Sequence, residues 1–303
     1  MIELSDERVI FEFSDAAEPA LTIPSGETVR IRTKDCFGNQ LQTPEDSIDA
    51  LDWDNVNPAT GPVFVEGAHA GDVLKVELLE VSVDDHTAMC TGEGEGTLGD
   101  IFHDGLSSTV KYIHDGKLVW DEARGVELDL KPMIGVIGVA PANGARINCG
   151  TPGHHGGNMD NTQIGQGTTL YFPVACEGAL FGCGDMHAVM GDGEIGVCGA
   201  EVAGHVTARL TALHDRTLSN PVLEDADRFI TIASAPTLDE ACDTAVHDMV
   251  AILTKRLSGI STEDLVMLLS LCADVQVCQI VDPQRTARFV VPKRVIEAYG
   301  FTW

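Results

Sequence analysis

Basic residues are scarce in this chain of 303 residues. Only 19 lysines and arginines face 47 aspartates and glutamates, which gives a formal net charge of -28. A surface of this charge repels phosphate backbones and anionic lipid headgroups, so we expect neither nucleic-acid binding nor attachment to acidic membranes. A neutral substrate is not hindered by this field, whereas an anionic substrate is repelled.

Long apolar runs and export signals are also missing. No run of 18 apolar residues exists, so no membrane-spanning helix is expected. Residues 1–13 carry acidic side chains instead of a basic stretch followed by an apolar run. The nine cysteines show neither CxxC nor zinc-finger spacing. These features predict a cytoplasmic protein whose cysteines are reduced.

Aromatic residues make up only 5% of the chain, so its core must rest on Val, Ile, Leu and Ala. The 31 glycines indicate many tight turns, which is typical of a β-rich architecture. Alternating apolar and polar residues predict strands at 29–33 and 73–83. Further strands are expected at 133–140, 168–174 and 275–281.

The pattern changes after about residue 235. Apolar residues recur at helical spacing and predict a helix over 238–258, which Gly259 ends. Residues 261–264 have the composition of a helix cap and predict a second helix over 262–273. We find no internal repeat and no linker. The chain is therefore expected to form one globular unit, residues 1–303. It has a β-rich part over 1–235, followed by a helical insertion and closing strand over 236–303.

Histidine, acidic residues and glycine gather between positions 148 and 201. Asp185 and His187 are two residues apart, so on an extended strand their side chains share one face and can bind one metal ion. Residues 192–193, an Asp-Gly pair between apolar segments, predict a hairpin-type turn. This turn can bring Glu194 back beside the pair.

Asp160 can join the same group from a neighbouring strand. A histidine with several carboxylates suits Zn²⁺, Mn²⁺ or Fe²⁺, and the carboxylate excess also suits Ca²⁺. Zn²⁺ is the expected cofactor, with Ca²⁺ as the alternative. The predicted metal ligands are Asp160, Asp185, His187 and Glu194. The predicted catalytic groups are Asp160, His187 and Glu194, with Glu194 as a further ligand or as the general base.

Each of these residues also has a simpler interpretation. An isolated Asp-x-His is more often a surface pair than a metal site. His154, His155 and Asn158 are candidates for substrate binding, but the two histidines lie in a glycine-rich stretch that equally predicts a solvated loop. Cys149 and Cys183 could act as nucleophiles, although cysteine is usually a small buried hydrophobe. The role of the glycine-rich, acidic residues 91–99 stays open.

Several long motifs follow one another along the chain. They are VNPATGP (residues 56–62), VEGA (65–68) with GD (71–72), GGNMD (156–160), GALF (178–181), GDMHA (184–188), GDGE (191–194), LSL (269–271) and the stretch 274–283. In this ordered set the chain resembles the acetamidase/formamidase family. The resemblance implies a β-sandwich body of jelly-roll or CUB-like type with additional α/β elements. It also implies hydrolysis of short aliphatic amides to an acid and ammonia, and a divalent metal held by the motif carboxylates and histidine.

The chain departs from the family pattern at a few positions. Met190 stands where the family usually has Gln, and residues 154–156 and 91–96 also differ locally. Three functions therefore stay open: a metal-dependent hydrolase of a small neutral amide such as formamide or acetamide, a hydrolase of a larger or cyclic amide, and a non-catalytic β-sandwich binding protein with a structural Ca²⁺ site. A catalytic site keeps an open position and a pocket, whereas a structural site is closed by protein ligands. The family also suggests a homodimer.

Overall fold

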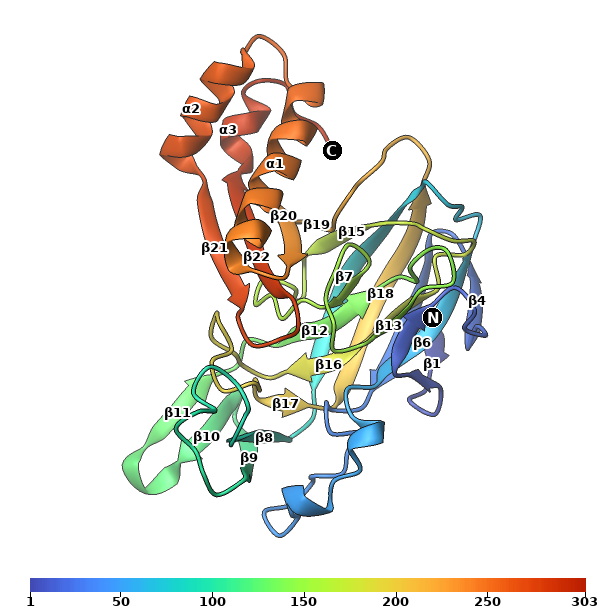
Figure 1. The fold of residues 1–303 in the computed structure, drawn as a ribbon. Coiled ribbons are helices and arrows are strands. Elements are labelled where there is room, and N and C mark those ends of the chain that lie inside the picture. The colour runs from blue at the N-terminus through green and yellow to red at the C-terminus, as the bar shows by residue number, and fades with distance from the viewer.

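The computed structural model describes residues 1–303 and is mainly β, as predicted (Figure 1). Two large sheets form the body. The first has nine strands. In spatial order they are β1 (Ile2–Leu4), β5 (Glu27–Thr33), β18 (Gly204–Leu213), β7 (Val73–Val83), β15 (Thr169–Pro173), β19 (Val222–Glu224), β20 (Arg228–Ala235), β22 (Arg285–Pro292) and β21 (Asp274–Gln279).

The second sheet has eleven strands. Its main path runs through β11 (Val126–Asp129), β10 (Lys117–Asp121), β9 (Leu106–His114), β8 (His86–Gly92), β17 (Glu201–Val202), β16 (Phe181–His187), β12 (Met133–Gly138) and β14 (Gly156–Asn158). Off this path, β6 (Ala59–Glu66) pairs with β16, β2 (Val9–Ile10) and β4 (Leu21–Pro24). A separate pair joins β3 (Glu12–Ser14) to β13 (Arg146–Asn148). Short 3-10 helices span Ile48–Ala50, Trp53–Asn55 and Glu122–Arg124.

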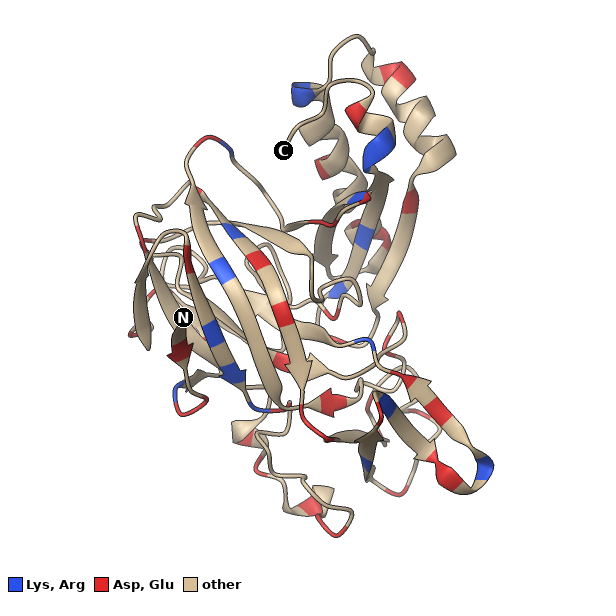
Figure 2. Cartoon of the chain, turned by 180° about the vertical axis from the view of Figure 1, so that it is seen from behind, with Lys and Arg blue, Asp and Glu red and all other residues tan.

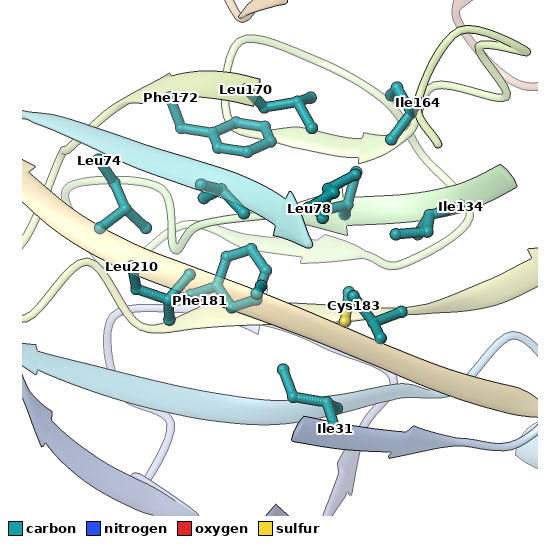
Figure 3. Close-up of a cluster of buried hydrophobic side chains, with 14 of the residues drawn as sticks. Ile31, Leu74, Leu78, Ile134, Ile164, Leu170, Phe172, Phe181, Cys183 and Leu210 are labelled. Carbon is teal, nitrogen blue, oxygen red and sulfur yellow. The ribbon is translucent and has the colours of Figure 1, made fainter. Parts of the chain in front are cut away.

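Aliphatic side chains from both sheets meet in one core of 35 buried residues, as a sandwich requires (Figure 3). Leu74, Leu78 and Leu210 come from the nine-stranded sheet, while Ile134 and Phe181 come from the other. Strands β5 and β7 lie where the alternating residues predicted them. The low aromatic content has its expected consequence, since most of this core is Val, Ile, Leu and Ala.

Both predicted helices are present. They are α1 (Leu238–Arg256) and α2 (Thr262–Cys272), and each ends within two residues of its predicted boundary. Thr237 and Glu240 form a capping box that satisfies backbone N–H groups at the start of α1. The buried residues of α1 recur every four positions, so one stripe faces β20 and β22. A third helix, α3 (Lys293–Glu297), was not predicted.

The helices lie against β20, β21 and β22 at one edge of the nine-stranded sheet (Figure 1). A second apolar cluster of 14 buried residues lies at this interface. Strand β20 pairs with β19 on one side and with β22 on the other, so hydrogen bonds run continuously from the body into residues 274–292. The single unit over 1–303 stays a prediction. None of the helices has the length and apolar composition needed to cross a membrane.

Candidate active site

The site is built on β16, the strand that carries Asp185 and His187. All seven of its residues are buried, and its neighbours are β12, β17 and β6. The backbone of Asp185 has φ 50°, which interrupts the ladder: Ile134 pairs with Met186 and Val136 with Gly184, while the intervening residues leave the register. This break leaves room between the strands for carboxylate side chains.

Four carboxylates surround the ring of His187. Its Nε2 lies 3.1 Å from Glu201 Oε1, 3.6 Å from Asp185 Oδ1, 3.8 Å from Asp160 Oδ1 and 4.0 Å from Glu194 Oε1. Nitrogen and oxygen ligands that lie about 2.0–2.2 Å from a zinc ion are about 3–4 Å from one another. The structure therefore brings all four predicted ligands together, and it adds Glu201 to them.

Most of these polar atoms have no hydrogen-bond partner. Both oxygens of Asp160, Oδ1 of Asp185, Oε2 of Glu201 and both ring nitrogens of His187 are buried and unpaired. Leaving charged groups unpaired inside a protein costs several kcal/mol each, and such groups are normally paired or bound to a metal. The donor set thus fits a divalent cation, with Asp160, His187 and Glu194 close enough together to hold it.

Burial also changes how these groups hold protons. It raises the pKa of Asp160 to about 6, and it raises the pKa of Glu194 and of Glu201 well above their usual value. Burial alone would lower the pKa of His187, but Glu201 and Asp185 raise it well above its usual value. Burial alone would raise the pKa of Asp185, but His187 beside it holds it below its usual value. Without a cation, the cluster therefore takes up protons.

We expect the cation-free protein to lose stability as the pH rises from about 4 to about 6. The folded pKa of Asp160 exceeds its unfolded value, so its stabilising effect is present at low pH and is lost through this window. The Asp160→Asn variant lacks this titration. Its free energy of unfolding should equal that of the wild type near pH 4 and exceed it by on the order of 3 kcal/mol near pH 7. Urea unfolding in the presence of a chelator measures both, and a gap that stays constant with pH would contradict the expectation.

A cavity of about 230 Å³ opens onto the cluster. Asp185, Glu194 and Glu201 line it, whereas Asp160 and His187 do not reach it. Phe37, Trp53, Val56 and Val197 contribute apolar surface, and Asn158 and Asp282 contribute polar groups. A larger cavity of about 580 Å³ lies beside α1, around residues 215–220, but it holds no group of metal-binding side chains.

Gly135 and Gly199 lie so close to the cluster that a side chain at either position would collide with it. A Cβ atom on Gly135 would lie 2.5 Å from both Asp160 Oδ1 and Asp185 Oδ2. A Cβ atom on Gly199 would lie 2.5 Å from Nδ1 of His187. Real Cβ contacts do not come this close, so only glycine allows the side chains to approach in this way.

The turn predicted at residues 192–193 is present, since the N–H of Glu194 donates to the backbone oxygen of Gly191. It does not join two paired strands directly, because it lies within residues 188–200, the long connection between β16 and β17. Gly193 hydrogen-bonds to the end of β21: its N–H donates to Cys278, and it accepts from the N–H of Ile280. Asp192 is bound by the fully buried Arg288, whose Nη2 lies 2.5 Å from its Oδ2. The C-terminal part of the chain therefore positions Glu194.

The family of this chain follows from comparison with known proteins. The sequence profile of the Acetamidase/Formamidase family matches residues 6–149 and 142–298. The chain belongs to the acetamidase/formamidase family. A recombinant predicted acetamidase/formamidase from Thermoanaerobacter tengcongensis has a similar structure, with a TM-score of 0.95 and 49% identity over 100% of this chain and 99% of that chain. An acetamidase from Bacillus halodurans gives a TM-score of 0.95 and 43% identity over 99% and 100% of the two chains.

Sequence relatives of this acetamidase/formamidase family member are more distant. The formamidase of Methylophilus methylotrophus is 27% identical over 263 residues, which cover 67% of this chain and 64% of the relative. An acetamidase of Mycolicibacterium smegmatis is 28% identical over 250 residues, or 62% of this chain and 61% of the relative. The matched region thus spans less than two thirds of the length of these relatives.

The predicted substrate-binding residues are placed differently from one another. Asn158 lines the cavity and donates through Nδ2 to Asp282 Oδ2 at 3.1 Å. His154 is exposed, and neither it nor His155 lines the cavity. The solvated loop expected for both histidines is wrong for His155, which is 1% exposed and packs edge-on against Phe13 beside β14. A role for the two histidines in substrate binding stays a prediction.

Three residues of the site were not predicted as part of it. Glu201 lies in the acid-rich segment and joins the cluster because β17 pairs with β16, where His187 stands opposite Glu201. Asp282 and Cys36 reach the cavity from distant parts of the chain, and no local pattern in the sequence marks them. In residues 91–99, Glu95 lines the same cavity, and the N–H of Thr97 donates to Ile195.

We expect the Cys149→Ala and Cys183→Ala variants to keep turnover within about tenfold of the wild type, or about 1.4 kcal/mol of barrier. Both thiols are fully buried away from the cavity, and burial raises the pKa of each to about 12, so neither supplies a thiolate. Ammonia release by the purified variants is the measurement. A larger loss in a variant that still melts at the wild-type temperature would favour a cysteine nucleophile.

Proposed function

We propose that this family member is a metal-dependent amidohydrolase that converts a short, neutral aliphatic amide into a carboxylic acid and ammonia. The observation that carries the proposal is the ring of four buried carboxylates within 4.0 Å of His187 Nε2, beneath a cavity open to substrate. Zn²⁺ is the proposed ion. The histidine nitrogen suits it, whereas Ca²⁺ prefers oxygen ligands alone.

The side chains divide into two groups by their proposed role. Asp160 and His187, which lie behind the cavity wall, and Asp185, which lines the cavity, would hold the ion. A zinc ion bound there would polarise the amide carbonyl and lower the pKa of a coordinated water. Glu194 lines the cavity, so its carboxylate can take a proton from the attacking water and pass it to the leaving nitrogen. Asn158, fixed by its hydrogen bond to Asp282, can donate to the substrate or orient it.

The dimensions and charge of the site favour a small neutral substrate. A cavity of about 230 Å³ is below the usual range of pockets for drug-sized ligands, about 300–1,000 Å³. Asp and Glu are also spread over the strands and loops around the molecule and greatly outnumber Lys and Arg (Figure 2). Formamide and acetamide carry no charge, so this field does not repel them.

The same features weigh against the alternative functions. A structural Ca²⁺ site in a non-catalytic protein would be closed by protein ligands, whereas three carboxylates of this cluster face a cavity. A large amide would need more room than this cavity has, and the assay below includes a γ-lactam because a small ring would fit. The cytoplasmic location and the homodimer stay predictions, and light scattering would test the second of them.

Ammonia release from a panel of amides tests the proposal. The panel contains formamide, acetamide, propionamide, benzamide and a γ-lactam, and each is assayed with protein stripped by a chelator and then reloaded with Zn²⁺ or Ca²⁺. We expect activity on the smallest amides with Zn²⁺ and its loss on stripping. Equal activity before and after complete stripping, or trapping of an acyl product by hydroxylamine, would contradict the metal-dependent route.

A further inference from the structure

Two cysteine thiols meet in the wall of the cavity that opens onto the cluster. Cys90 lies on β8 and Cys198 in the connection between β16 and β17, and their Sγ atoms are 3.4 Å apart. Both thiols are free, and both residues line the cavity. A disulfide bond is about 2.0 Å long, so an approach of about 1.4 Å would bring the two sulfurs to bonding distance.

The backbone keeps the two cysteines close, although 108 residues separate them in the sequence. Strand β8 pairs with β17 at Ala88 and Glu201, beside the two cysteines (Figure 1). The backbone of Cys90 is fixed, because it stands opposite Ser108 in the ladder between β8 and β9. Cys198 belongs to no strand. Formation of a disulfide would therefore move the connection and not β8.

The two thiols differ in their readiness to lose a proton. The hydrogen bond from Cys198 lowers the pKa of Cys90, although burial opposes this effect. The same hydrogen bond, together with burial, raises the pKa of Cys198 well above its usual value. A thiolate is the form that reacts with peroxides, and oxidation-sensitive cysteines often stand next to a second thiol that resolves the product. Cys90 is therefore the residue that reacts first, and Cys198 is the one that closes the bond.

The connection at Cys198 is part of the active site. The next residue, Gly199, lies so close to His187 that a Cβ atom there would be 2.5 Å from its Nδ1. On the other side, Val197 lines the cavity, and its N–H donates to the backbone oxygen of Glu194. Movement of Cys198 toward β8 would therefore displace the backbone that packs against His187 and the backbone that carries Glu194.

We propose that a hydroperoxide converts Cys90 and Cys198 into a reversible disulfide, and that this bond reshapes the cavity and slows amide hydrolysis. The sulfur of Cys90 attacks the terminal oxygen of the hydroperoxide, so an S–O bond forms, the O–O bond breaks, and an alcohol or water leaves after taking up a proton. The sulfur of Cys198 then attacks the sulfur of Cys90, and hydroxide leaves with the thiol proton of Cys198 as water. Two electrons pass from the thiols to the peroxide. Only the effect on hydrolysis rests on the proposed function.

Treatment of the reduced, zinc-loaded protein with hydrogen peroxide tests the proposal. Disulfides are mapped by mass spectrometry of peptides prepared without a reductant, and ammonia release is measured before and after addition of dithiothreitol. We expect a crosslink between the peptides of Cys90 and Cys198. The kcat/KM for the preferred amide should fall by about tenfold or more, because displacements of about 1 Å in an active site commonly cost this much. Dithiothreitol should remove the crosslink and restore the rate.

Three variants separate this reaction from general oxidation, and each is compared with its own reduced form. Cys90→Ser should form no crosslink and should keep its rate in peroxide. Cys198→Ser should also form no crosslink, and its Cys90 should be labelled by dimedone, which traps the unresolved sulfenic acid. Cys242→Ser is the matched control, because Cys242 lies on α1 outside the cavity, and it should respond as the wild type does.

The proposal is overturned if peroxide leaves Cys90 and Cys198 without a crosslink in the wild type, or if the crosslink joins either of them to Cys36, which lines the same cavity. It is also overturned if the expected disulfide forms without slowing turnover. Reduced protein that shows no activity on any amide would instead refute the proposed function, and the peptide map would still decide whether the disulfide forms.

Discussion

Replacing His187 by Ala is expected to lower kcat/KM for the preferred amide by about a thousandfold or more, a loss of about 4 kcal/mol of transition-state stabilisation. His187 supplies the only nitrogen among the proposed ligands, and four carboxylates lie within 4.0 Å of its Nε2. Without it the ion is held by carboxylates alone, and these repel one another in a buried site. Zinc content by mass spectrometry should fall together with ammonia release.

His205→Ala provides the control for this change. His205 lies on β18 in the other sheet, beside Arg30 and Arg32, so its loss should leave zinc content and turnover near wild type. The assignment of His187 as a ligand is refuted if the His187→Ala protein keeps its zinc and works within about tenfold of the wild type.

Replacing Gly135 by Ala is expected to lower kcat by about a hundredfold or more while the protein still folds. The added methyl group would lie 2.5 Å from carboxylate oxygens of both Asp160 and Asp185, and also 2.9 Å from the backbone oxygen of Asp185. The two side chains must therefore separate, which moves two proposed ligands away from His187. Displacements of about 1 Å in an active site commonly cost two orders of magnitude in rate.

Gly191→Ala is the matched control for this substitution. Gly191 lies in the connection that carries Glu194, but a Cβ atom there meets nothing within 4 Å, and its backbone conformation suits any residue. This variant should keep its zinc, its turnover and its melting temperature. Wild-type zinc affinity and turnover in the Gly135→Ala protein would show that the gap between β12 and β16 is not needed for the site.

The strands and helices could be predicted where one local pattern sufficed. Strand β7 alternates along its length, and α1 has an apolar stripe with a capping sequence before it, so each segment contains the information for its own conformation. The turn predicted at residues 192–193 forms, but its position beside the cluster depends on tertiary contacts. Gly193 hydrogen-bonds to the end of β21, and Arg288 binds Asp192, so contacts with a distant part of the chain determine the backbone there.

The candidate site, like the fold, could be predicted from the sequence only in part. Asp185 and His187 could be paired from their spacing, because side chains alternate along any strand. Glu201 could not be placed, because its contact with His187 depends on the register between β16 and β17. Cys36 and Asp282 come from opposite ends of the chain and meet only at the cavity.

The sequence by itself determined the mainly β body, the two C-terminal helices, the acidic composition and the family with its ordered motifs. Periodicity, capping and composition act over a few residues or over the whole chain, so they can be read without coordinates. Only the tertiary structure decided which carboxylates surround His187, that His155 is buried, and that two glycines leave room for the side chains of the cluster. These features depend on strand register and close packing between segments far apart in the chain, and no local pattern encodes such contacts.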